Sequence, residues 1–107
     1  MRILEFEVDK QRLRKNIYCD FTNIVAGTEG YLKAKFDFIG PDWLGCKKAA
    51  SFWYNGHEYA VMLDSDNSCM IPTDALIGDM FEVQVSGMRD KSYQIKTIKN
   101  KVKQEVT

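Results

Sequence analysis

The sequence has little histidine and proline, widely spaced cysteines and no excess of either charge. Its 107 residues include one histidine, two prolines and three cysteines, and 15 basic side chains balance 15 acidic ones. A protein that binds nucleic acid through its overall charge normally carries a basic excess. We therefore expect its partners not to be nucleic acids.

Long apolar runs are also missing. Charged residues interrupt the apolar ones from the start of the chain, which reads MRILEFEVDK. A secretory signal needs an unbroken apolar run of about 7–15 residues, and a membrane helix needs about 20. We expect no membrane partner, and a chain that stays in a cytosol until it assembles or binds.

The cysteines and the histidine lack the spacing of a metal site. Cys19, Cys46, His57 and Cys69 follow one another at intervals of 27, 11 and 12 positions, whereas structural zinc sites normally contain a close pair such as C-x₂₋₄-C. An odd number of separated cysteines is not a disulfide framework either. We predict free, mostly buried thiols, no metal and no cofactor.

No group of residues has the pattern of a catalytic centre. His57 follows Asn55-Gly56, which places it at an exposed turn, and nothing fixes a serine or cysteine beside it. The run Asp64–Asn67 resembles the start of a calcium loop, but Cys69 and Ala75 stand where an EF-hand has glycine and glutamate. We predict an ordinary turn there and a protein that is not an enzyme.

Apolar and polar residues alternate strictly in three segments, around residues 4–8, 32–38 and 81–86. Successive side chains of a β-strand point to opposite faces, so each segment has one buried and one wet face. With the strands of the hairpin described next, this pattern predicts a core that contains Leu4, Phe6, Leu32, Phe36, Phe52, Val61, Phe81, Val83 and Val85.

The clearest local signal is a hairpin in which Asn55-Gly56 separates the apolar runs 49–54 and 57–63. Shorter strands are expected at 69–71, 93–97 and 102–106, and single helical turns at 41–45 and 72–78. About seven to nine short strands with no helical layer predict one domain, residues 1–107, built as a two-sheet antiparallel β-sandwich. A small barrel is the alternative.

The hairpin also carries the candidate partner-binding residues. Trp53 and Tyr54 are neighbours on a strand, so one of them must face outward, and Tyr59 lies just beyond the turn. We predict that a protein partner binds a sheet edge or an aromatic surface made of these three residues. The alternative is that the rings only cover one another.

The second half of the chain carries an ordered set of motifs. A strand ending in Leu-Asp leads to an acidic turn, then to Cys-x-Ile-Pro, to a turn closed by glycine, to Phe-x-Val-x-Val-x-Gly and to a last strand pair. The matching residues are Leu63, Asp64, Cys69, Ile71, Pro72, Gly78, Phe81, Val83, Val85, Gly87, Thr97, Asn100 and Val102. This order resembles the immunoglobulin-like domain at the N-terminus of tail, baseplate and related structural proteins in phages and prophages of Gram-positive bacteria.

The first half resembles the same family. The runs Ile24–Gly27 and Tyr31–Phe36 are similar to its first long strand, and Asp42–Gly45 with Lys48–Phe52 to its next. The resemblance implies an immunoglobulin-like sandwich. Members of the family usually continue beyond this domain, so for a chain ending at Thr107 the resemblance leaves two expectations: a decoration or adaptor subunit, or a virion module redirected to another partner.

The function that the resemblance implies is structural. We expect a phage protein that docks in a tail, baseplate or capsid assembly, located in the virion or in the cytoplasm of the infected or lysogenic host. The alternative is a small phage-encoded inhibitor of a host protein, such as an anti-defence or anti-CRISPR protein. Both functions imply protein partners, and a homo-oligomer stays open.

Overall fold

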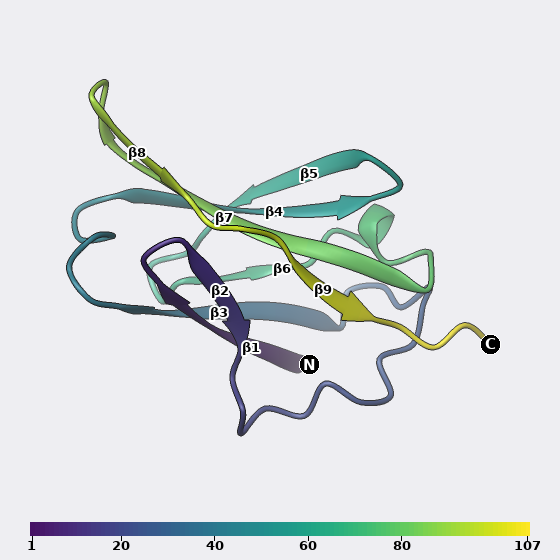
Figure 1. Cartoon of the computed structure of the whole chain (residues 1–107). Coiled ribbons are helices and arrows are strands. Elements are labelled where there is room, and N and C mark those ends of the chain that lie inside the picture. The colour runs from purple at the N-terminus through teal and green to yellow at the C-terminus, as the bar shows by residue number, and fades with distance from the viewer.

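The chain folds into nine β-strands and one short 3₁₀ helix. The computed structural model describes all residues from Met1 to Thr107 (Figure 1). The strands are β1 (Arg2–Asp9), β2 (Arg12–Lys15), β3 (Leu32–Ile39), β4 (Lys47–Tyr54), β5 (His57–Met62), β6 (Ser68–Met70), β7 (Met80–Asp90), β8 (Tyr93–Lys96) and β9 (Asn100–Lys103), and the helix η1 (Thr73–Ala75) lies between β6 and β7. No helix has the length and apolar character that a membrane span requires.

The strands form two sheets. One has the order β2-β1-β3-β6, and the other the order β5-β4-β7, with β8 and β9 both pairing with β7. The predicted two-sheet β-sandwich is therefore confirmed.

One strand pair departs from the predicted antiparallel arrangement. β1 and β3 run parallel, with Arg2 opposite Leu32 and Asp9 opposite Ile39, whereas the other strand pairs are antiparallel, as predicted. Parallel neighbours need a long connection that carries the chain back to the same end of the sheet. β2 runs back along β1, and residues 16–31 complete the connection. The Arg2 side chain holds this last part by donating to the carbonyl oxygens of Asp20, Thr22 and Asn23.

The core lies between the two sheets. Every residue that the alternation placed in the core is buried except Val61, which is half-buried. That one prediction is wrong because Val61 belongs to β5, which forms the edge of its sheet and has no strand beyond it. The Trp43 ring joins the core from the loop before β4, and its Nε1 donates to the Lys10 carbonyl oxygen at 2.9 Å.

The turns follow the local signals. Asn55 and Gly56 both have positive φ angles, 52° and 79°, as a two-residue type I′ hairpin requires. The helical turn predicted after Pro72 is confirmed as η1. The segment from Pro41 to Gly45 forms a hydrogen-bonded turn in place of a helical one.

Gly87 on β7 provides a test of the core packing. A methyl group at this position would lie 2.9 Å from two carbons of the Trp43 ring and 3.1 Å from Cys46 Cβ. We expect Gly87→Ala to lower the free energy of unfolding by about 1–3 kcal/mol, because the buried ring must move. Urea denaturation measures this. The neighbouring change Ser86→Ala, on the outer face, should leave stability unchanged, and equal values for both variants would contradict the packing described.

Candidate docking surface

The two long sides of the sandwich differ in the hydrogen bonds that join the edge strands of the two sheets. Along one side, β2 is tied to β9, since Asn100 Nδ2 donates to the Leu13 carbonyl oxygen at 3.1 Å and Lys15 Nζ donates to Asn100 Oδ1 at 2.6 Å. The backbone N–H of Ile98 also donates to the Gln11 carbonyl oxygen at 2.9 Å. On the other side, β5 and β6 form the margins of the two sheets (Figure 1). The bond between the sheets there belongs to the connecting turn, where the Asp64 N–H donates to the Ser68 carbonyl oxygen at 2.8 Å, and no bond of this kind reaches the backbone of β5 itself.

The strands at the margins also differ in how they discourage pairing with other chains. Natural proteins protect sheet edges with short strands, basic side chains, prolines or bulges. β2 has four residues and three basic side chains, β6 has three residues, and β8 and β9 are four-residue pieces that carry lysines. β5 has six residues, pairs with β4 without any register shift, and contains no lysine, arginine or proline. It is the unprotected edge.

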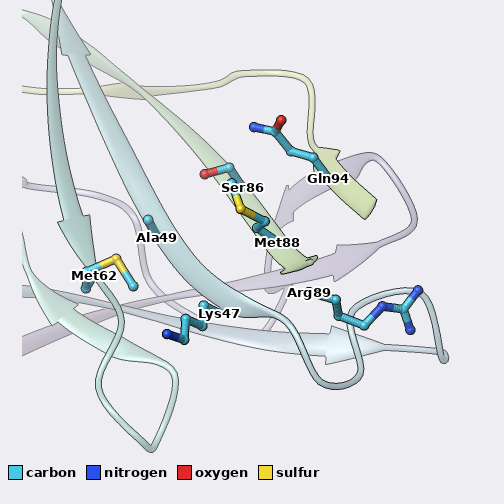
Figure 2. Close-up of a pocket in the computed structure, with 8 residues that line it drawn as sticks. Lys47, Ala49, Met62, Ser86, Met88, Arg89 and Gln94 are labelled. Atoms are coloured by element: carbon cyan, nitrogen blue, oxygen red, sulfur yellow. The ribbon is translucent and has the colours of Figure 1, made fainter. Parts of the chain in front are cut away.

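A hollow of about 390 Å³ lies on the outer face of the same sheet, next to this edge. Its lining is shown in Figure 2 and consists of Lys47, Ala49, Met62, Ser86, Gly87, Met88, Arg89 and Gln94. Small side chains on the two central strands form the hollow, because Ala49 and Ser86 lie opposite each other on β4 and β7. Met62 and Met88 stand beside them and are 60% and 51% exposed.

The charged residues of the hollow have one sign. Lys47 and Arg89 are basic, and no acidic side chain lines it. The Arg89 guanidinium lies over the Tyr93 ring, 3.7 Å from its centroid, and so is held at one end of the hollow. Methionine is flexible and adapts to different apolar partners. The surface therefore suits an apolar side chain that has neutral or acidic neighbours.

The structure places the three aromatic residues of the hairpin on two faces of the sheet. Trp53 lies on the outer face, half-buried, with Lys99 Nζ 3.8 Å from its ring centroid and its Nε1 donating to Gln84 Oε1 at 3.3 Å. Tyr59 lies opposite Phe52 and packs against the core.

Tyr54 also lies on the inner side of its strand, where its ring covers Gly78 so closely that a methyl group there would meet it. The three rings therefore do not share one face of the sheet, and the binding of a partner at this hairpin stays a prediction. Trp53 alone shares the face of the hollow.

The residues considered for catalysis or calcium lie in turns. His57 is exposed at the hairpin turn, as predicted. Residues 64–67 connect β5 to β6, with Asn67 at a positive φ of 62° and Asp66 Oδ1 accepting from both the N–H and the hydroxyl of Ser68. The ordinary Asp/Asn turn is confirmed there. No group of three or more histidine, cysteine, aspartate and glutamate residues is placed to hold a metal ion.

The three thiols are free and lie on separate parts of the chain. Cys69 on β6 is buried, whereas Cys19 and Cys46 are half-buried, so burial is less complete than predicted. Burial raises the pKa of the Cys69 thiol to about 12, with the nearby Asp64 carboxylate acting in the same direction.

Several exposed apolar residues were missed by reasoning from the sequence. Met62 and Met88 both stand at outward positions of their strands, where alternation normally places polar residues. An apolar side chain at an outward position could therefore have been recognised from the sequence as an exposed contact residue. Ile17 and Tyr18, in the connection after β2, are 83% and 92% exposed, and no periodic pattern in that segment marks them.

Comparison with known proteins adds no relative. No protein family matches the chain, and no curated protein matches it.

The cysteines provide a test of this description. The thiolate is the form of cysteine that reacts with iodoacetamide, so we expect Cys69 in the native protein to be alkylated far more slowly than Cys19 and Cys46. Peptide mass spectrometry after timed labelling measures this, and labelling in urea is the control in which all three should react. Alkylation of native Cys69 as fast as the other two would contradict its burial.

Proposed function

We propose that this chain is a non-enzymatic structural protein of a bacteriophage particle, a β-sandwich module that docks in a tail, baseplate or capsid assembly. Two lines of support are independent of each other. The motifs of the sequence resemble those of immunoglobulin-like domains in phage structural proteins. The open side of the sandwich is suited to contact with a neighbouring subunit.

The observation that carries the proposal is the contrast between the two sides of the sandwich. Hydrogen bonds of Asn100 close one side, while β5 leaves a six-residue edge uncovered on the other. An uncovered edge without lysine, arginine or proline favours uncontrolled association. A strand of this kind is therefore better explained if a partner normally covers it, as in β-augmentation.

The hollow supplies a second contact on the same surface. Met62 and Met88 offer exposed apolar area beside the open edge, and the neighbouring Lys47 and Arg89 favour a partner without basic groups. We therefore propose a neighbouring virion subunit that places an apolar side chain, with acidic or neutral neighbours, between the two methionines. Anchors of this kind dominate the energy of protein interfaces.

Purified particles of the phage or prophage that encodes the chain provide the first test. We expect mass spectrometry to find the chain in gradient-purified particles at a constant ratio to the major structural proteins. A chain that is synthesised early and is absent from particles would contradict the proposal and favour the alternative, an inhibitor of a host protein.

A pair of methionine variants then tests the surface. We expect Met88→Lys to reduce incorporation into particles by at least about tenfold, because it places a charge where an apolar contact forms. Met70→Lys is the matched control, since Met70 is 38% exposed on the outer face of the other sheet. Equal incorporation of both variants would show that docking uses another surface. Thermal unfolding should be the same for both proteins.

A further inference from the structure

We infer that the partner of the β5 edge is the β5 edge of a second copy of this chain, paired antiparallel with Ala60 at the two-fold axis. The inference rests on the proposed function only in taking β5 as the docking edge. Its evidence is the direction of the backbone groups of β5 and the self-complementary register of its side chains.

The backbone of β5 offers hydrogen-bonding groups at every second residue. The Leu63 N–H donates to the Lys48 carbonyl oxygen at 3.0 Å, and hydrogen-bonded pairs alternate with non-bonded pairs along an antiparallel ladder. In the register of β4 and β5, the N–H and C=O groups of Glu58, Ala60 and Met62 therefore point away from β4. None of them takes part in the hydrogen bonds that the chain makes outside its strands.

One register uses all of these groups. With Ala60 opposite Ala60 of the second copy, Glu58 lies opposite Met62 and Met62 opposite Glu58, so three consecutive bonded pairs form. A two-fold axis placed at Tyr59 or Val61 keeps the faces matched but moves Met62 or Glu58 beyond the end of the facing strand. The register centred on Ala60 therefore leaves the fewest backbone groups unpaired.

The side chains agree with this register. It places Tyr59 opposite Val61 of the other copy, and the two-fold symmetry forms this pair twice. Aromatic and β-branched residues form favourable cross-strand pairs, and both are only half-buried in the single chain although they already pack against the core. The small Ala60 side chain fits at the two-fold axis, and Glu58 is drawn over its own sheet by the hydroxyl of Ser51, which donates to its Oε2.

Pairing of this kind makes a symmetric dimer with one continuous sheet across both copies. It is isologous, the commonest closed symmetry of soluble oligomers. A single pair of six-residue strands makes a small interface, so the dimer should depend on concentration. The hollow between Met62 and Met88 faces outward from the sheet and stays open, so the dimer presents two hollows on one face to further subunits.

Sedimentation equilibrium of the purified chain tests the inference. With rising concentration, the mass should move from the 12.4 kDa of one chain toward twice that value. Ala60 faces itself, so Ala60→Lys and Ala60→Glu should each raise the dimer dissociation constant by at least about tenfold through like-charge contact. An equimolar mixture of the two variants should dimerise again, because opposite charges then meet at the axis.

Two controls distinguish an effect at the β5 edge from an effect of charge on the outer face and from a loss of folding. Ser86→Lys adds the same charge two strands away and should leave dimerisation unchanged, and circular dichroism should show that all variants are folded. A chain that stays monomeric, a dimer unaffected by the Ala60 variants, or a mixture that fails to recover would each overturn the inference. A monomeric chain that still enters particles overturns this inference alone, and a β5 dimer absent from particles overturns only the proposed function.

Discussion

The hydrogen bonds of Asn100 decide which side of the sandwich is available to a partner. Its amide donates to β2 and accepts from Lys15, so two edges that belong to different sheets cover each other. The same side is reinforced by the Ile98 N–H, which bonds to the turn between β1 and β2. With that side closed, β5 remains as the longest uncovered edge of the sandwich.

The hollow on the outer face beside that edge is formed by small residues on the central strands. Ala49 and Ser86 are neighbours on the central strands and leave room, while the methionines flanking them remain exposed. The outer face of the other sheet differs in its charge. Its hollow of about 340 Å³ is lined by Glu5, Lys35, Asp37 and Asp66 among others, and Glu7 and Arg14 form an ion pair at 3.4 Å on adjacent strands.

Most strands were predictable from the sequence because alternation reports directly on burial. The same is true of the hairpin, since Asn55-Gly56 tolerates positive φ angles. The parallel pairing of β1 and β3 was not predictable, because it depends on the path of an irregular connection held by Arg2. Local pattern also cannot tell a central strand from an edge, which is why Val61 was assigned to the core.

The candidate site was predicted only in outline. A sheet edge was among the expected binding modes, and β5 is a candidate for it, whereas of the three aromatic residues only Trp53 lies on the outer face beside that edge. Trp53 and Tyr54 alternate across the sheet, and the register then sets Tyr59 on the side of Phe52, against the core. A two-residue turn at Asn55-Gly56 fixes this register, so the side of Tyr59 followed from the predicted hairpin once its strands were paired residue by residue.

Amide hydrogen exchange along β5 tests the central claim most directly, because it reports on each backbone group separately. At low concentration the N–H groups of Glu58, Ala60 and Met62 should exchange quickly, while those of Tyr59 and Val61, bonded to β4, should exchange slowly. At high concentration the first three should become protected as the second copy covers them. Rapid exchange of these three amides at every concentration, or protection already present in the dilute monomer, would contradict the account.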